Sequence, residues 1–378
     1  MAVQSVPSKF PSPKELLISP YITGPLLLYL TKINPSALER IPWFPDLSMT
    51  LPFSLPFDIR NNVTLRPTPL LKTLKVLFAF GVLAHLNRFL NRRALNYGHL
   101  KKQGVPWDFQ TEGKETILIT GGCSGFGKEM VKMFSQQTKS KILVLDVQEL
   151  PVDLKNIPRL TYHKVDLTSN EDIHNVIAKV LSQSPPTVLI NNAGIAHAHT
   201  ILDTTDEFLE KLFRINVMSH FTLIRLILPT LMKQRKGHIV SIASMASYTG
   251  QASLGDYCAT KAAVLGMHES LVQELKHRYE DQGGHTIQAS IVHPLWANTP
   301  LVGSFGAELR KSGQPVLTPA DVASRVVNQV LQGESGSVFV PAKQKAGSLL
   351  RALPDWVALA VRATLEGATA TARGTKPT

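Results

Sequence analysis

One stretch of the sequence, Thr116–Lys128, restricts the possible folds more than any other. Its first five residues, TILIT, favour a β-strand and lead directly into Gly121, Gly125 and Gly127. Glycine lets the backbone turn tightly and lets a ligand approach it, and a following helix presents unpaired N–H groups and its positive dipole end. The stretch predicts a strand, a turn and a helix suited to a pyrophosphate, although its glycines are spaced more widely than in G-x-G-x-x-G. An ordinary glycine-rich loop is the alternative.

Strand-like and helix-like segments alternate over residues 113–341. The expected strands are short and rich in Val, Ile and Leu, which is typical of a parallel sheet covered on both faces. Helix caps are expected at Thr168 and Thr204, each with a glutamate three residues later, and at Thr318. The alternation predicts a doubly wound parallel α/β fold. The expected strands are Thr116–Thr120, Ile142–Asp146, Leu160–Asp166, Thr187–Asn191, His238–Ser244, Ile287–His293 and Ser337–Val340.

Polar or turn-forming residues stand at the ends of these strands. Ligands of open α/β sheets bind outside the carboxyl ends of the strands, so these residues are expected to share one site. Asp146 follows the glycine-rich turn at the distance where a carboxylate accepts hydrogen bonds from an adenosine ribose, and its charge would repel a 2′-phosphate. NAD(H) is therefore favoured, while Lys128 beside the turn keeps NADP(H) possible; a simple turn residue is the alternative for Asp146. The strand-end residues are Gly121, Asp146, Asp166, Asn192, Ser244 and Pro294.

Tyr257 and Lys261 are four residues apart, so they share one face of an expected helix. A phenol titrates at about 10, and a neighbouring ammonium and a cationic nicotinamide would both lower this pKa. Tyr257 would then act as a general acid or base near neutral pH, with the Ser244 hydroxyl holding the substrate oxygen. A solvent-exposed helix carrying this pair by chance is the alternative, and the glycine-rich turn before it argues against that.

Together the motifs resemble the short-chain dehydrogenase/reductase family over about residues 113–341. The resemblance rests on T-G-G-C-S-G-F-G from Thr120, N-N-A-G from Asn191, Ser244 and Y-x-x-x-K from Tyr257. It implies a seven-stranded Rossmann sheet with strand order 3-2-1-4-5-6-7. It also implies an enzyme that interconverts an alcohol and its ketone or aldehyde by hydride transfer with NAD(P)(H), and a dimer or tetramer.

The resemblance also implies roles for individual residues. Tyr257 would be the catalytic acid/base, Ser244 would position the reacting oxygen, and Lys261 would lower the tyrosine pKa and bind the nicotinamide ribose. Asn216 matches the asparagine that supports a proton-relay water. The chain departs from the family at Leu295, where glycine is usual and leucine cannot readily adopt a glycine-only backbone. The implied cofactor-binding residues are Gly121, Cys123, Ser124, Gly125, Phe126, Gly127, Asp146, Asp166, Asn192, Ala193, Gly194, Tyr257, Lys261, Pro294 and Thr299.

Looser motifs are similar to the retinol and hydroxysteroid dehydrogenase branch of the family. They are Thr187–Gly194, Lys276–Tyr279 and Leu317–Ala323. Members of that branch are typically attached to the endoplasmic reticulum or lipid droplets by an apolar N-terminal segment, which implies a lipophilic substrate such as a retinoid, steroid, fatty alcohol or polyketide-like molecule. The apolar segment Trp296–Gln314 resembles the family's substrate loop, and simple loop packing is the alternative for it.

Residues 1–112 differ from the rest of the chain because prolines crowd the first 69 positions and prevent long regular elements. Leu70–Leu90 is the best helix in this region, with the apolar run Val76–Ala84 between lysines and arginines. A spanning helix needs about 20 mostly apolar residues, and this run is roughly half that length. The segment predicts membrane attachment through a short span or an interfacial helix, with a helix docked on the catalytic domain as the alternative.

The net charge of +12 would suit either nucleic acid or an anionic membrane. No run of five Lys or Arg and no nucleic-acid module occurs, so nucleic acid is not expected, and the charge beside apolar stretches favours a membrane or lipid-droplet surface. Ser348–Arg362 would be an interfacial or a packed helix, followed by a disordered tail, Gly367–Thr378. Two cysteines without metal-ligand spacing predict no disulfide framework and no metal site.

The predicted organisation is a Pro-rich N-terminal extension (1–112), a Rossmann domain (113–341) and a C-terminal helix with its tail (342–378). The predicted protein is a membrane-associated oxidoreductase. A soluble reductase of a small metabolite is one alternative, with the N-terminal region as a packed extension. A non-enzymatic, NAD-binding membrane scaffold is the other, and the joint presence of Asn216, Ser244, Tyr257 and Lys261 argues against it.

Overall fold

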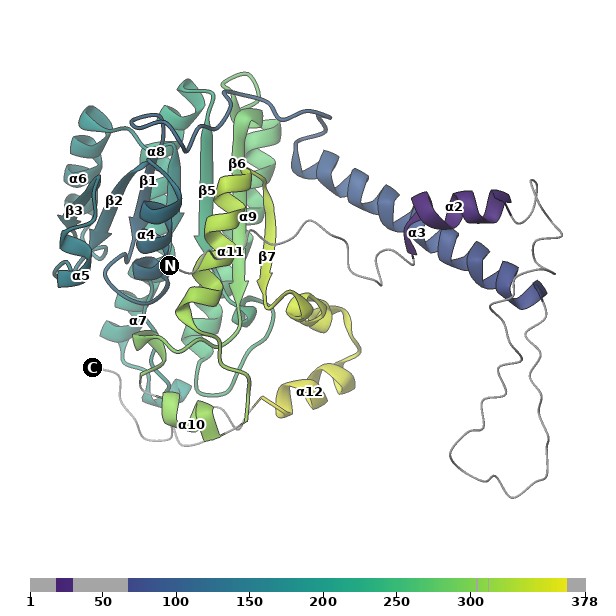
Figure 1. Ribbon diagram of the computed structural model, residues 1–378. Coiled ribbons are helices and arrows are strands. Elements are labelled where there is room, and N and C mark those ends of the chain that lie inside the picture. The colour runs from purple at the N-terminus through teal and green to yellow at the C-terminus, as the bar shows by residue number, and fades with distance from the viewer. Residues whose placement is uncertain (1–17, 30–66, 304, 312, 366–378) are drawn as a thin grey trace. The chain divides into compact units, whose positions relative to one another are not determined.

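The structure is a computed structural model that describes residues 18–29, 67–303, 305–311 and 313–365 (Figure 1). The chain divides into two compact units, Met1–Ala94 and Leu95–Thr378. The predicted tail Gly367–Thr378 and most of the proline-rich positions lie outside the described residues. The predicted domain limits at residues 112 and 341 stay predictions.

Seven parallel strands form one sheet in the larger unit, in the order β3-β2-β1-β4-β5-β6-β7. This order confirms the predicted doubly wound Rossmann fold. The direction of strand succession reverses between β1 and β4, and the carboxyl ends of these two strands therefore form the crevice where ligands of such sheets bind. The strands are β1 Thr116–Thr120, β2 Lys141–Asp146, β3 Leu160–Lys164, β4 Val188–Asn191, β5 Gly237–Ile242, β6 Ile287–Pro294 and β7 Gly336–Val340.

Helices cover both faces of the sheet (Figure 1). Alternate residues of β1 face different cores: Leu118 packs with helices α6, α8 and α9, whereas Ile117 and Ile119 pack with α4 and α11. Because both faces are covered, the strands read as unbroken apolar runs. The helices of this unit are α4 Gly125–Gln137, α5 Val152–Lys155, α6 Asn170–Gln183, α7 Asp206–Phe213, α8 Ser219–Lys233, α9 Gly255–His277, α10 Gly306–Lys311, α11 Pro319–Gln332 and α12 Asp355–Ala363.

Several predicted boundaries differ from the observed ones. β3 and β5 end earlier than expected, so Asp166 and Ser244 stand two residues beyond their strands. Ser169, one residue after the expected cap, begins α6 by accepting a hydrogen bond from a backbone N–H three residues on, at 3.1 Å, and Thr205 does the same for α7 at 3.2 Å. In both places the hydroxyl one residue later forms the cap, although it has no glutamate three residues on, so the capping-box spacing alone does not identify the cap. The cap at Thr318 is confirmed, with a reciprocal capping box.

The C-terminal segment forms two short elements rather than one helix. A 3₁₀ helix covers Ala342–Ala352, and α12 follows after Pro354. The proline interrupts the apolar stretch because its ring is incompatible with a helix interior but suits a helix start. On α12, Trp356 and Leu359 are exposed while Ala358 is buried.

The smaller unit contains two packed helices, α2 (Pro20–Leu28) and α3 (Pro67–Leu95). A side chain at Gly81 would overlap the carbonyl oxygen of Ile18, so this glycine permits the close approach. Pro20 occupies the first helical turn of α2, where its missing N–H costs no hydrogen bond, and Pro25 lies inside the same helix. The expected helix Leu70–Leu90 is longer at both ends, with 29 residues.

Two helical stretches among the described residues have the length and apolar composition needed to cross a membrane. One is Leu71–Leu95, whose most apolar 18-residue window is 11% buried, and the other is Asp206–Lys233, whose corresponding window is 61% buried. The second stretch is mostly buried, as expected for a core helix of the sheet domain. Only the first leaves most of its apolar side chains exposed.

Candidate active site

The glycine-rich turn is held at the carboxyl ends of β1 and β4. Gly121 has φ +67°, and a side chain at Gly127 would overlap the Gly121 carbonyl oxygen. The Asn192 side-chain amide donates hydrogen bonds to the carbonyls of Thr120 (2.9 Å) and Gly121 (3.0 Å). In return the Thr120 hydroxyl accepts from the backbone N–H groups of Asn192 and Ala193, each at 3.0 Å. The turn and the strand beside it therefore form one hydrogen-bonded unit.

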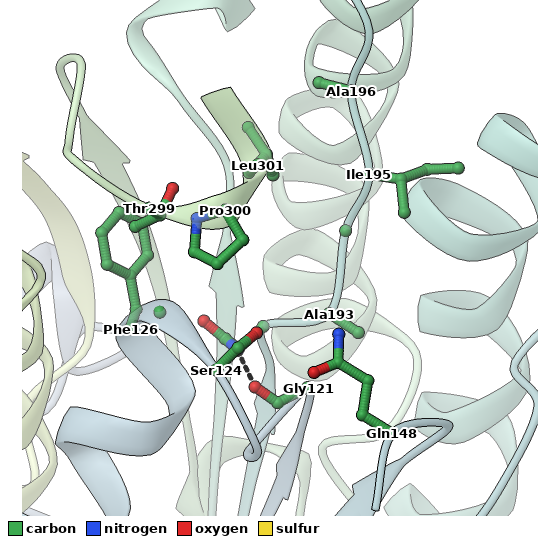
Figure 2. Close-up of a pocket in the computed structure, with 13 residues that line it drawn as sticks. Gly121, Ser124, Phe126, Gln148, Ala193, Ile195, Ala196, Thr299, Pro300 and Leu301 are labelled. Carbon is green, nitrogen blue, oxygen red and sulfur yellow. Dashed lines mark hydrogen bonds between the residues drawn. The ribbon is translucent and has the colours of Figure 1, made fainter. Parts of the chain in front are cut away.

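Three adjoining cavities of about 130, 280 and 60 Å³ follow this edge of the sheet. Gly194 lines all three, and Gly121 and Ser124 are shared by the first two, so the cavities form one groove. Figure 2 shows the middle cavity, where Thr299 and Phe126 face the Ala193–Ala196 segment. The shared lining residues make the groove continuous along this edge of the sheet.

Asp146 lies at the end of the groove with the 130 Å³ cavity. Its Oδ2 accepts a hydrogen bond from the Cys123 N–H (2.8 Å) and its Oδ1 from the Gln148 N–H (2.9 Å). A carboxylate has about four lone-pair sites, so two further acceptor positions are open to ligand hydroxyls. The Cys123 side chain packs in the core under the turn, where burial and the Asp146 charge raise its thiol pKa to about 12.

Asp166 lines the same cavity, and its Oδ1 accepts hydrogen bonds from the backbone and the hydroxyl of Thr168, both at 2.8 Å. Lys128 is directed to another partner. Its Nζ pairs with Asp153 at 2.9 Å, and Lys128 is not among the residues that line the groove.

Ser244, Tyr257 and Lys261 meet in the cavity at the other end of the groove. Both the Tyr257 and the Ser244 side chains line this cavity, and the Ser244 Oγ accepts a hydrogen bond from the Ala246 N–H at 3.1 Å. Lys261 Nζ donates to the Ile242 carbonyl at 2.9 Å and lies 5.6 Å from the centroid of the Tyr257 ring. A hydroxyl, a phenol and an ammonium therefore converge on one small space.

Burial controls the ionisation of these groups. It lowers the pKa of Lys261 to about 8. It raises the pKa of Tyr257 above its ordinary value, and the hydrogen bond with Ser244 opposes this rise. In the protein alone the Tyr257 pKa is therefore raised, and loss of solvation of the phenolate is the largest cause. The expected lowering by Lys261 and a cationic nicotinamide stays a prediction.

Asn216 lies behind the groove in a π-helical turn, Arg214–Met218, between α7 and α8. Its Oδ1 accepts from the Ile195 N–H (2.9 Å), and its Nδ2 donates to the Ile195 carbonyl (3.0 Å) and the Thr260 hydroxyl (3.2 Å). The side chain thereby ties the Gly194–Ile195 segment to the residue before Lys261. Such π-turns often occur at functional sites.

Most of the expected site residues line the groove, and three do not. Cys123, Gly127 and Asn216 lie in its supporting structure rather than in its wall. Four non-glycine positions of the described chain have positive φ, and Leu295 is not one of them, so leucine is accommodated there without backbone strain. Sequence reasoning missed several lining residues, and only their position beside known motifs could have indicated them. They include Leu145, Val147, Gln148, Ile195, Ala196 and Ile215, whereas Ala297 and Pro300 fall in the expected substrate segment Trp296–Gln314.

The expected substrate segment is divided between two environments. Phe305 and Leu309 are buried in a cluster with Tyr257, so they act as loop packing. Trp296, Leu301 and Val302 line the cavity that contains Tyr257. The wall of this cavity is therefore largely apolar.

Three relatives are similar in sequence to this chain over part of its length. Dehydrogenase RED2 of Cochliobolus heterostrophus is 37% identical over 177 residues, which are 46% of this chain and 64% of RED2. The 17-beta-hydroxysteroid dehydrogenase 13 of Mus musculus is 29% identical over 235 residues, 60% of this chain and 74% of the relative. The estradiol 17-beta-dehydrogenase 11 of Pongo abelii is 30% identical over 235 residues, 60% of this chain and 75% of the relative.

Solved structures show the same fold. A 4-hydroxyisoleucine dehydrogenase complexed with NADH superposes with a TM-score of 0.53 at 22% identity, covering 60% of this chain and 96% of that one. A 3-ketoacyl-(acyl-carrier-protein) reductase from Brucella melitensis complexed with NADH gives 0.52 at 22% identity, covering 61% and 97%.

A family model described as short chain dehydrogenase matches residues 115–309, more than half of the chain. The match includes the glycine-rich turn, Ser244, Tyr257 and Lys261. The chain belongs to the short-chain dehydrogenase family, whose members are NAD(P)-dependent oxidoreductases that act on CH–OH groups.

Proposed function

We propose that this protein interconverts an alcohol and its ketone or aldehyde on a lipophilic substrate, with NAD(H) as the cofactor. The observation that carries the proposal is the convergence of Ser244, Tyr257 and Lys261 at one end of a groove that begins at Asp146. Three relatives are dehydrogenases by name, and two of them are named for a hydroxysteroid or estradiol.

The hydrogen-bond donors and acceptors along the groove match those of a nicotinamide dinucleotide. Backbone N–H groups of Gly125–Gly127, at the N-terminus of α4, suit the pyrophosphate. Asp146 suits the adenosine ribose hydroxyls, and Lys261 suits the nicotinamide ribose. NAD(H) is favoured over NADP(H) because the Asp146 carboxylate would repel a 2′-phosphate while Lys128 is paired with Asp153. When bound, the cofactor supplies or accepts the hydride.

The side chains divide the remaining work. Ser244 holds the substrate oxygen by hydrogen bonding, next to the Tyr257 hydroxyl. In reduction Tyr257 donates its proton to that oxygen, and in oxidation it removes the proton from the alcohol. The Lys261 ammonium favours the phenolate that remains after donation. Asn216 holds the Gly194–Ile195 segment that lines the groove.

The test uses purified full-length protein in mild detergent, with retinoids, steroids, long-chain alcohols and their carbonyl forms as substrates. NADH and NADPH are followed by absorbance, with Tyr257→Phe beside the wild type. We expect turnover with NADH that falls at least about a thousandfold in the variant. Turnover with NADPH alone would contradict the Asp146 argument, and undiminished turnover in Tyr257→Phe would contradict the catalytic assignment. NADH binding without turnover on any substrate would favour a scaffold.

We also propose that α3 attaches the protein to a lipid surface, at the endoplasmic reticulum or a lipid droplet. Val76, Phe80 and Leu83 are more than half exposed, and basic residues flank the apolar part at both ends. The uncharged stretch Val76–Asn87 is about 18 Å long, less than the roughly 30 Å of a bilayer core. Partial insertion, with Lys and Arg stems reaching the headgroups, is therefore favoured over a full span.

Flotation with anionic vesicles tests this attachment. The wild type should float with the vesicles, whereas the double variant Phe80→Lys/Leu83→Lys should stay in the soluble fraction and keep NADH binding. A variant that still floats would place the attachment elsewhere in the chain. A homo-oligomer is expected from the family, and sedimentation of the same samples measures it.

A further inference from the structure

A buried cluster of polar side chains lies beside Tyr257 but outside the groove. His199 Nε2 lies 3.3 Å from Asp256 Oδ2, and His199 Nδ1 lies 3.3 Å from His197 Nδ1. His199 is 1% exposed, and the Asp256 side chain is 6% exposed. Phe208 meets the His199 ring edge-on at 5.4 Å and closes the cluster on one side. The reaction as described above uses none of these groups.

The cluster joins two segments that are far apart in sequence. His199 belongs to the segment that follows β4, and Asp256 belongs to the first turn of α9. A backbone hydrogen bond from His199 to the Ser253 carbonyl (2.9 Å) reinforces the junction. Ser253 has φ +64°, a conformation that L-residues hold only where the surroundings enforce it.

Asp256 also binds the backbone of the catalytic residue. Its Oδ1 accepts a hydrogen bond from the Tyr257 N–H at 2.7 Å. The first turn of a helix has N–H groups without helical partners, so this turn is the part of α9 that is most easily displaced. Tyr257 lies in it, and the position of the phenol relative to Ser244 depends on it.

The two contacts of Asp256 are complementary. One oxygen holds the Tyr257 amide and the other faces His199, which is buried and anchored to Ser253. Neither His199 Nε2 nor Asp256 Oδ2 has a hydrogen-bond partner among the described residues, so the polar contact that each atom makes is the 3.3 Å ion-pair contact between them. A buried carboxylate that loses its partner destabilises the fold. Asp256 therefore depends on His199 staying in place.

We propose that His199 and Asp256 are positioning residues that hold the first turn of α9 and so place the Tyr257 hydroxyl for proton transfer. The inference rests on the proposed function and deepens it. Neither side chain touches the groove; they act through the backbone of Tyr257. A displacement of about 1 Å at a reacting group can reduce the rate about a hundredfold, which sets the scale of the expected effect.

The test compares His199→Ala, Asp256→Ala and their double variant in full-length protein. Each single variant should lower kcat by about 10- to 100-fold, with the NADH dissociation constant and KM changed less than about threefold. The double variant should be no slower than the worse single one, since both remove the same support. Asp256→Asn keeps an acceptor for the Tyr257 amide and should retain most of the activity. Asp206→Ala, an exposed aspartate in the first turn of α7, is the matched control.

Amide hydrogen exchange gives a readout that needs no turnover. The peptide Ser253–Lys261 should exchange faster in His199→Ala and Asp256→Ala than in the wild type or Asp206→Ala. Unchanged kcat and exchange in both variants would overturn the inference, as would fully additive losses. If Asp256→Ala does not fold, Asp256→Leu, which fills a similar volume without an acceptor, with His199→Gln completes the same cycle. A wild type without turnover would contradict the proposed function, while faster exchange would still support the positioning role.

Discussion

At the scale of single residues, the site depends on polar side chains whose partners are backbone atoms. Asp146 is held by the N–H groups of Cys123 and Gln148, and Lys261 by the Ile242 carbonyl. Backbone partners are not lost when a neighbouring side chain is replaced. The orientation of the Asp146 carboxylate and of the Lys261 ammonium is therefore fixed by the fold.

Replacement of Asp146 should change the choice of cofactor. In Asp146→Ala the acceptor for the ribose hydroxyls and the charge that repels a 2′-phosphate are both lost. We expect KM for NADH to rise about 10- to 100-fold, while KM for NADPH falls, in steady-state assays with both cofactors. Glu149→Ala, an exposed carboxylate three residues away, is the control and should leave the preference unchanged. An unaltered ratio in Asp146→Ala would show that another group selects the cofactor.

Cofactor affinity should depend on the ionisation of Lys261. Its pKa of about 8 means that the ammonium is present below this pH and is lost above it. Affinity for NADH should therefore fall as the pH rises from 7 to 9.5, by at most about tenfold per pH unit. Fluorescence titrations measure it. Lys261→Met should bind weakly at every pH, whereas the exposed-lysine variant Lys139→Met should follow the wild type.

At the scale of elements, the first turn of α4 tolerates no added side chain at Gly127. The backbone carbonyl of Gly121 occupies the space that a Cβ would need, and the Asn192 amide closes the other side at 2.8 Å. Neither neighbour can move without breaking the link between β1 and β4. The glycine is therefore required by close approach, and its φ is unexceptional.

Two glycine-to-alanine variants should change the stability of the protein in opposite directions. Gly127→Ala should abolish NADH binding and lower the melting temperature because the turn must open. Gly266→Ala lies on an exposed position of α9 with free space around its Cβ, and should stabilise the protein by about 0.5–1 kcal/mol. Calorimetry and NADH titration compare the two. Tolerance of Gly127→Ala with full binding would mean that the turn is looser than its contacts indicate.

At the scale of the whole molecule, the covered sheet buries histidines as well as apolar residues. Burial lowers the pKa of His220 and His238 to about 3, and that of His268 and His293 to about 4. The sheet domain therefore holds four imidazoles in their neutral form. In the unfolded chain each would titrate at about 6.5.

Stability should consequently fall as the solution becomes acidic. Between pH 6.5 and 5 the unfolded chain binds protons on these histidines and the folded chain does not, so acid favours unfolding. Each histidine contributes up to about 1.4 kcal/mol per pH unit. Urea unfolding at pH 7, 6 and 5 measures the slope, and His220→Leu should reduce it by about a quarter. A free energy of unfolding that is constant over this pH range would show that these histidines are also protonated in the folded protein.

The amino-acid sequence by itself determined the strands, the glycine-rich turn and the shared face of Tyr257 and Lys261. These features depend on residues within a few positions of one another, through strand propensity, glycine conformation and the helical repeat. The family resemblance added the strand order, which the sheet confirms.

Only the tertiary structure decided which side chains meet across long stretches of chain. It placed Asn216 behind the groove, moved two helix caps to the neighbouring hydroxyl, and brought His199 to Asp256. Local pattern cannot specify such contacts, because they arise when separate βα units pack on one sheet and their loops are closed at the same edge. The raised pKa of Tyr257 belongs to the same class, since it follows from burial that many distant residues create together.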